Sequence, residues 1–298
     1  MINNTSSIRI DVKKKQLQED NCHLFHFSAN EGDVHRYIAS CIPAHWHQEL
    51  ELFFLVSGNV CIGIGDEFHE VKAGEGCFIN TGVLHSFTGN TSSPCIFRSF
   101  VFDSNIVGGA PGSVFDAVYI RPLLESGISF LKFEKDSGDT TFFQHFDQTF
   151  LACVSEKAGY EFQVRSSLSD ILFFITQKSR LATSRTLETV QETRIKQMLC
   201  WIDENIRADI TLKAIADTAG IFPRECQRIF SQYLHRSPME YLQWKRILAA
   251  AEKLASTKEP VTTIALTYGF SSPSYFSKKF KCFVGSTPSE YRALIQKP

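Results

Sequence analysis

The sequence contains no apolar run long enough to cross a membrane, and none near its start that would serve as a secretory signal. We therefore expect a cytosolic protein. Its nine cysteines are odd in number, and no two of them stand in CxxC spacing. This pattern argues against a disulfide framework and against a cysteine-based zinc site, so we expect reduced thiols that are mostly buried.

The sequence also lacks a large excess of either charge, with 31 Lys and Arg against 32 Asp and Glu. This balance is uneven along the chain. Residues 187–298 hold 16 Lys and Arg against 11 Asp and Glu, whereas residues 1–186 hold 15 against 21. A basic C-terminal part favours binding to nucleic acid, although an ordinary solvated surface has the same signature.

An internal repeat organises the C-terminal part of the chain. Ala216 and Gly220 stand 49 residues before Ala265 and Gly269. An alanine followed four residues later by a glycine predicts a helix-turn-helix, because the small residue lets two helices touch and the glycine can adopt the positive φ of the turn. The positions that repeat at a spacing of 50 are Phe230, Pro238, Glu240 and Tyr241 in the first copy and Phe280, Pro288, Glu290 and Tyr291 in the second.

A long helix is predicted between the two copies, over residues 239–256. At 1.5 Å per residue it would span roughly 27 Å. A connector of this length can hold two helix-turn-helices about one DNA turn apart, roughly 34 Å, in successive major grooves.

The second copy reads YGFSSPSYFSKKFKCFVGSTPSEYR over residues 268–292, with phenylalanines at helical spacing and lysines on the other faces. Two helix-turn-helices joined by a long helix, the second ending in this motif, resemble the DNA-binding domain of AraC-type transcription regulators. The resemblance covers about the last third of the chain and implies sequence-specific binding to double-stranded operator DNA. It also leaves RNA polymerase open as a further partner. The stretch Ile221, Phe222 and Pro223 departs from the polar helix start that is usual in the family.

Recognition helices read base edges with the exposed side chains of their first turns, while other side chains bind phosphates. In the first copy this assigns DNA contact to Arg224, Gln227 and Arg228, since arginine can pair with guanine and glutamine with adenine. Glu225 could accept a hydrogen bond from a cytosine amine, but we expect it to form an ion pair with Arg228 instead. The DNA-contacting residues expected in the second copy are Pro273, Ser274, Ser277, Lys278 and Lys281. These are poorer base readers, so we predict that the first helix discriminates sequence and the second mainly provides phosphate affinity.

Short alternating strands are predicted from residue 22 to residue 103, with glycine-bearing turns between them, as in an antiparallel barrel or jelly roll. In the stretch HWHQELELFFLVSG, His45, His47 and Glu51 all stand at odd positions. If this stretch is a single strand, the three side chains share one face. His85 follows a later glycine-rich turn.

These residues resemble the cupin fold. Its first motif, HxH followed after three residues by Glu and after six more by Gly, is matched in full and ends at Gly58. Its second motif, G, five residues, PxG, two residues and H, is matched at Gly74, Gly82 and His85, with Asn80 in place of the usual proline. Together the two resemblances imply an α+β protein: an N-terminal cupin-like antiparallel β-barrel with a helical dimerisation element, and a C-terminal all-α double helix-turn-helix domain.

Two interpretations of the barrel follow. The residues His45, His47, Glu51 and His85 form a donor set that can bind a divalent metal ion with open coordination positions. One interpretation is therefore a metal-dependent cupin enzyme, such as an isomerase or dioxygenase, fused to a DNA-targeting domain. In the AraC-type context, however, such barrels resemble effector sensors. We therefore expect a regulator, not an enzyme, in which the same four residues bind a small polar effector such as a sugar.

Helical spacing returns in residues 141–157 and 161–177, with a break at Gly159. The apolar residues expected on the buried stripes are Phe142, Phe143, Phe146, Phe150, Leu151 and Val154 in the first helix and Phe162, Leu168, Ile171, Leu172 and Ile175 in the second. Phe173 and Phe174 extend the apolar surface beyond one stripe. Because the resembling family has its dimer contact here, we predict a homodimer through residues 161–177.

The chain is thus expected to comprise four segments. Residues 1–20 would form a frayed N-terminal arm, and residues 21–178 the cupin-like effector-binding and dimerisation domain. Residues 179–192 would be a polar linker, and residues 193–298 the double helix-turn-helix domain. Residues 104–112 are expected to form a loop, and residues 120–133 give no clear signal.

Overall fold

The computed structural model describes residues 2–5, 25–89, 93–181 and 190–296. These residues divide into two compact units, one formed by residues 2–181 and the other by residues 190–296. Among the helices that the structure describes, none is both long and apolar enough to span a lipid bilayer.

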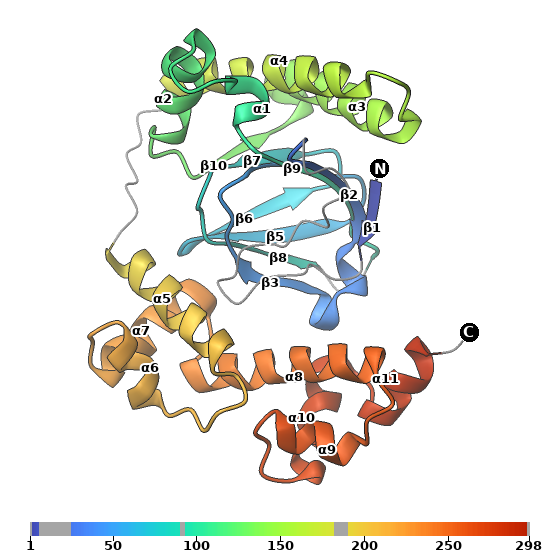
Figure 1. Cartoon of the computed structure of the whole chain (residues 1–298), viewed down its shortest axis with the longest axis vertical. Coiled ribbons are helices and arrows are strands. Elements are labelled where there is room, and N and C mark those ends of the chain that lie inside the picture. The colour runs from blue at the N-terminus through green and yellow to red at the C-terminus, as the bar shows by residue number, and fades with distance from the viewer. Residues whose placement is uncertain (1, 6–24, 90–92, 182–189, 297–298) are drawn as a thin grey trace. The chain divides into compact units, whose positions relative to one another are not determined.

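The first unit is built on two β-sheets (Figure 1). The larger sheet has the strand order β1-β2-β9-β4-β7-β10, and the smaller has the order β3-β8-β5-β6. The strands are β1 (Ile2–Thr5), β2 (Phe27–Asp33), β3 (Cys41–His45), β4 (Leu50–Leu55), β5 (Asn59–Ile64), β6 (Glu67–Lys72), β7 (Gly76–Ile79), β8 (His85–Gly89), β9 (Ile96–Phe102) and β10 (Phe130–Phe133). In the described part of the chain the pairs are antiparallel, except for β1 with β2. The predicted antiparallel barrel is confirmed.

Residues 2–5 were expected to be part of a frayed arm, and this prediction is wrong for them. They form β1, in which Ile2 pairs with Ala29 and Thr5 with Gly32. Without β1, the edge of β2 would leave backbone N–H and C=O groups unpaired. A short strand that covers such an edge satisfies them. Most of the remainder of the predicted arm, residues 6–20, lies outside the described residues.

Helices cover the larger sheet on the face opposite the smaller sheet (Figure 1). The helical elements of the first unit are η1 (Val34–Arg36), η2 (Ile38–Ser40), α1 (Asn105–Gly108), η3 (Asp116–Ile120), α2 (Arg121–Leu124), η4 (Lys135–Ser137), α3 (Thr140–Ser155) and α4 (Tyr160–Leu181). The predicted helical pair is present as α3 and α4, which pack on one another. The loop expected at residues 104–112 contains α1, and the unassigned stretch contains α2 and β10.

The larger sheet is apolar on both faces because a different layer covers each face. On β4, Phe53 and Leu55 pack in the core between the two sheets, whereas Leu50 and Leu52 pack in the core that includes α3 and α4. This alternation follows from the two-residue repeat of a strand. Glu51 points the same way as Phe53 and so enters the core between the sheets.

The expected buried stripe on α3 is correct at Phe142, Phe146 and Phe150 but wrong at Leu151 and Val154, which are 65% and 58% exposed. An α-helix turns 100° per residue, so a side chain 12 positions beyond Phe142 has rotated about 120° away from it. On α4 the stripe is wrong only at Phe162, which is 78% exposed. The helices also extend into the predicted linker: residues 179–181 belong to α4 and residues 190–192 to the next helix, while residues 182–189 lie outside the described residues.

The second unit is entirely helical. Its helices are α5 (Val190–Glu204), α6 (Leu212–Thr218), α7 (Pro223–Leu234), α8 (Pro238–Ser256), α9 (Val261–Thr267), α10 (Pro273–Val284) and α11 (Pro288–Ile295). The pairs α6–α7 and α9–α10 are the two helix-turn-helices, and α8 contacts helices of both. In their turns Gly220 and Gly269 have φ of 63° and 71°, the left-handed values for which glycine was expected. Ala216 and Ala265 are fully buried.

Four of the eight described thiols are buried, namely Cys77, Cys95, Cys153 and Cys226. Two are half-buried and two, Cys61 and Cys282, are exposed. Burial is therefore less general than expected.

Candidate functional site

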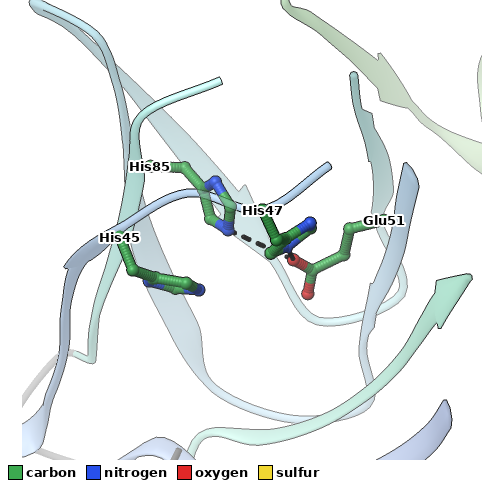
Figure 2. Close-up of side chains that lie close together, drawn as sticks. All are labelled: His45, His47, Glu51 and His85. Atoms are coloured by element: carbon green, nitrogen blue, oxygen red, sulfur yellow. Dashed lines mark hydrogen bonds and ion pairs between the residues drawn. The ribbon is translucent and has the colours of Figure 1, made fainter. Parts of the chain in front are cut away.

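The structure brings His45, His47, Glu51 and His85 together in the first unit (Figure 2). Each of the four residues is at most 5% exposed. One donor atom from each of them lies within 4.8 Å of the others. A carboxylate and three imidazoles this deeply buried need polar partners, so the four groups form one interdependent cluster.

The predicted reason for this convergence is wrong. His45 is the last residue of β3 in the smaller sheet, and β4 in the larger sheet begins only at Leu50. The chain therefore turns a corner between the sheets, and His47 lies in that corner. His85 is the first residue of β8 and pairs directly with His45. The residues meet because three strands, β3, β4 and β8, converge with a corner, not because they share one strand face.

Each histidine is oriented by a backbone carbonyl group two residues away in the sequence. The Nδ1 atoms of His45, His47 and His85 lie 2.7, 3.0 and 2.8 Å from the carbonyl oxygens of residues 43, 49 and 83 respectively. A carbonyl oxygen can only accept, so each Nδ1 donates its proton, and the neutral ring then carries its lone pair on Nε2. This second contact fixes the tautomer and the ring direction, as is usual for histidines that bind metal ions.

The Nε2 atoms of His47 and His85 face one carboxylate oxygen. They lie 3.3 and 3.2 Å from Oε2 of Glu51. His85 Nε2 is buried and has no hydrogen-bond partner of acceptable geometry. Lone pairs on two nitrogens and an anionic oxygen repel one another at this distance unless a proton or another cation lies among them.

The electrostatics of the cluster favour a cation. Burial alone would raise the pKa of Glu51, but the hydrogen bond with His47 and the nearby imidazoles of His47 and His85 hold it well below its usual range. Burial would likewise lower the pKa of His47, yet the hydrogen bond and charge of Glu51 raise it. Burial, followed by the charges of His85 and His47, lowers the pKa of His45 well below its usual value. The cluster therefore retains a buried carboxylate beside a neutral imidazole.

The four donors fit a divalent transition metal. Imidazole and carboxylate ligands bind such ions at about 2.0–2.2 Å, which places neighbouring ligand atoms of a tetrahedral site about 3.4 Å apart. The ligand atoms here lie within 4.8 Å of one another, so a bound ion would draw them closer together. Three imidazoles and one carboxylate suit zinc, iron, nickel or copper better than calcium.

In the second unit the predicted DNA-contacting side chains of α7 reach the surface. Arg224, Gln227 and Arg228 are exposed. The predicted ion pair is present: Nε and Nη2 of Arg228 donate to the Glu225 carboxylate at 2.9 and 2.7 Å. Nη1 of Arg228 also donates to Gln232 at 3.0 Å. Arg228 is thus held along its own helix, and Arg224 and Gln227 lie nearer the helix start.

On α10 the exposed predicted residues are Ser274, Lys278 and Lys281, and the half-buried ones are Pro273 and Ser277. Pro273 occupies the first turn, and Ser272 caps the helix by accepting from the backbone N–H of Tyr275.

Sequence reasoning missed one residue that connects the loop before the first helix-turn-helix to the turn of the second. Arg246, on α8, donates to the carbonyl oxygens of Ile206 and Ala208 at 2.9 and 2.6 Å, and to that of Gly269 at 3.1 Å. The first two carbonyls follow α5, and the third lies in the turn between α9 and α10. Helical periodicity marks Arg246 only as polar, so no sequence signal identified its partners.

The two units therefore define a helix-turn-helix protein that carries a cupin barrel. Comparison with known families agrees: residues 215–294 match the helix-turn-helix domain family, and residues 27–102 match the cupin domain family. The chain is 27% identical over 296 residues to "Uncharacterized HTH-type transcriptional regulator YdeC" of Bacillus subtilis. The alignment covers 96% of this chain and 98% of that protein.

The C-terminal part is 35% identical over 115 residues to HTH-type transcriptional activator AarP of Providencia stuartii, covering 39% of this chain and 85% of AarP. A crystal structure of an AraC-type DNA-binding domain-containing regulator from Chromobacterium violaceum is 29% identical, with a TM-score of 0.35, and covers 36% of this chain and 96% of that one. The chain belongs to the AraC family of transcription regulators, as its motifs predicted. These relatives are transcription regulators, so the enzyme interpretation gains no support from them.

Proposed function

We propose that this protein is a DNA-binding transcription regulator that responds to a small polar effector, with residues 193–298 binding the operator and residues 21–178 binding the effector and forming the dimer. Residues 179–192 would join the two parts, and the protein would act in the cytoplasm without catalysing a reaction. The observation that carries the proposal is the pair of helix-turn-helices on one connecting helix, each exposing polar or cationic side chains at the start of its second helix.

The two recognition helices would divide the work. On α7, Arg224 and Gln227 are exposed near the helix start and have the donors and acceptors to read guanine and adenine. On α10 the exposed residues among those predicted to contact DNA are Ser274, Lys278 and Lys281, which suit phosphate contacts. Arg228 would reach DNA only by leaving its bonds to Glu225 and Gln232.

DNA reading can be tested with the full-length protein and a pool of random duplexes. We expect selection to enrich one sequence, bound at least about a thousandfold more tightly than random DNA at the same salt concentration. Fluorescence anisotropy should show affinity for both falling as salt rises, because phosphate contacts release counterions. Binding without any sequence preference would reject a specific regulator.

The effector would bind at the cluster of His45, His47, Glu51 and His85. Oriented Nε2 atoms and a buried carboxylate suit a molecule with several hydroxyl groups, such as a sugar. The same four residues would also hold a divalent metal ion, which would supply a positive centre for an oxygen atom of the effector. RNA polymerase would be a further partner at the promoter.

Thermal-shift screening of sugars and related polyols tests this site. A ligand present at 100 times its Kd should raise the free energy of unfolding by about 2.7 kcal/mol. The shift should disappear in His47→Ala and persist in the control His26→Ala, because His26 is exposed and lies outside the cluster. Equal shifts in both variants would place the ligand elsewhere.

Metal binding has a separate test. After incubation with zinc or nickel and removal of free ions, elemental analysis should find about one ion per chain. His47→Ala should lose the ion and His26→Ala should retain it. Equal metal content in the two variants would reject these four residues as ligands.

Regulation requires that the effector bind two states of the protein unequally. By linkage, an effector that changes operator affinity by some factor must have its own affinity changed by the same factor when operator is present. The effector is titrated with and without the selected duplex, and the duplex with and without the effector. The two affinity ratios should be equal.

A further inference from the structure

Phe222, at the start of α7, has the highest exposed fraction of the large apolar side chains that the structure describes, 85%. It is the N-cap residue of the helix. An aromatic ring this exposed adds apolar surface to water and makes no compensating hydrogen bond.

The residue stands where four other helices of the second unit, α6, α8, α10 and α11, have a capping side chain. Residues 237–240 (SPME) and 287–290 (TPSE) begin α8 and α11 with capping boxes, in which the first residue accepts from a backbone N–H and the glutamate accepts from the N–H of the first residue. Residues 222–225 (FPRE) keep the proline and the glutamate of this pattern, but phenylalanine cannot accept a hydrogen bond.

The missing cap changes the bonding of the glutamate too. Glu240 and Glu290 accept from the backbone N–H groups of Ser237 and Thr287, both at 2.8 Å. Glu225 instead binds Arg228. The second helix-turn-helix keeps a cap at the matching position, where Ser272 accepts from Tyr275 N. The first helix-turn-helix has thus exchanged a capping side chain for an exposed ring.

The ring lies among side chains suited to DNA. Arg224, two residues further along, and Gln227 are also exposed. The N-terminal residues of a recognition helix are those that meet base edges in the major groove. The groove edge of most bases offers only donors and acceptors, whereas thymine presents an apolar C5-methyl group, with which phenylalanine makes favourable contact.

We infer that Phe222 is a specificity-determining residue that contacts the methyl group of a thymine beside the base read by Arg224. This inference rests on the proposed binding of DNA through α7. The contact excludes water from both apolar groups. The free energy gained in this way offsets the cost, in the free protein, of the exposed ring and the missing helix cap.

The test uses full-length protein and the duplex that it selects from a random pool. Each thymine in that duplex is replaced singly by uracil, which removes only the methyl group, and affinities are measured by anisotropy. The parent protein should lose three- to tenfold at one thymine, as expected for burial of one methyl group plus packing. Phe222→Ala should lose a similar factor on the thymine duplex and show no further loss on the uracil duplex.

Two further variants guard against misreading the result. Phe222→Ser can cap the helix, so it should keep or raise the melting temperature and still be insensitive to uracil. Leu294→Ala, which removes another strongly exposed side chain on α11, should retain the parent's sensitivity to uracil. Failure of the parent to select any sequence would refute the proposed function itself. If selection succeeds but Phe222→Ala shows the same uracil sensitivities as the parent, the thymine contact is wrong.

Discussion

At the scale of single residues, the barrel depends on one carboxylate in an apolar strand. Every residue of β4 except Glu51 is apolar, and burying a charge is costly unless it is paired. His47 and His85 provide that pairing. The sequence motif therefore marks a set of residues that must occur together.

Single residues should also separate base reading from phosphate binding. Arg224→Ala should lose roughly 1–3 kcal/mol on the selected duplex and relax the preference at one base pair. Lys278→Ala should weaken binding to cognate and random DNA alike and reduce the salt slope by about one. Anisotropy titrations on both duplexes at several salt concentrations measure these effects. An equal loss for Arg224→Ala on cognate and random DNA would contradict its assignment.

At the scale of elements, several side chains hold the second helix-turn-helix in place from outside it. Arg246 binds carbonyl oxygens after α5 and in the turn between α9 and α10, and Arg207 lies over the ring of Tyr268 with its Cζ 5.4 Å from the ring centroid. Gln243, also on α8, donates to the hydroxyl of Tyr275 at 3.2 Å. These contacts hold the second helix-turn-helix against α8 and against the loop between α5 and α6.

The two turn glycines give a matched test of this connection. A Cβ at Gly269 would lie 2.8 Å from the Arg246 guanidinium, whereas nothing lies within 4 Å of a Cβ at Gly220. Gly220→Ala should cost about 1–2 kcal/mol of unfolding free energy because its φ is positive. Gly269→Ala should cost about 1–2 kcal/mol more, since Arg246 must leave its carbonyls. In an Arg246→Ala background, urea unfolding should find the two glycine changes equal. A persistent difference there would reject Arg246 as its cause.

The helical pair of the first unit offers a pH-dependent test. Asp139 is 3% exposed and accepts from Lys178 Nζ at 2.5 Å and from Ser137 Oγ at 2.7 Å. Burial raises its pKa, but Lys178, Ser137 and a backbone N–H outweigh burial and lower it. Its stabilising effect is therefore complete above the unfolded pKa, about 3.9, and is lost as pH falls through the lower folded pKa.

We expect Asp139→Asn to lower the unfolding free energy by about 1–3 kcal/mol at pH 7. The difference from the parent protein should shrink as the pH is lowered from 5 towards 3. Urea unfolding across this range measures it, with the exposed Asp136→Asn as control. A loss that stays constant with pH would show that the carboxylate charge is not responsible.

At the scale of the whole molecule, the exposure of individual side chains selects the residues that test the predicted homodimer through residues 161–177. Leu172 is 1% exposed and packs in the core with α3, so it is not available to a partner, whereas Phe173 is 51% exposed. Phe173→Glu should give a folded monomer, because a charge would be buried in the interface. Leu172→Glu should instead disrupt the first unit.

Light scattering and circular dichroism distinguish these results. The control Gln148→Glu, at an exposed position of α3, should leave both mass and helicity unchanged. A dimer of unchanged mass in Phe173→Glu would exclude this surface as the contact.

The sequence by itself determined the repeat of helix-turn-helices, their glycine turns and the residues of the histidine–glutamate cluster. Helical periodicity, turn glycines and motif spacing depend on neighbours within a few residues, and these are present in the sequence itself. Gly220, Gly269 and the Glu225–Arg228 pair were predictable for this reason.

Only the tertiary structure decided how the histidine–glutamate cluster is assembled, which apolar residues stay exposed and which carbonyl groups Arg246 binds. His47 lies in a corner between sheets rather than on a strand, Leu151 and Val154 rotate away from the core, and Arg246 finds carbonyls about 40 and 23 residues distant in sequence. Strand register, the layer covering each face and contacts between distant segments are set by packing of the whole chain, which local pattern does not encode.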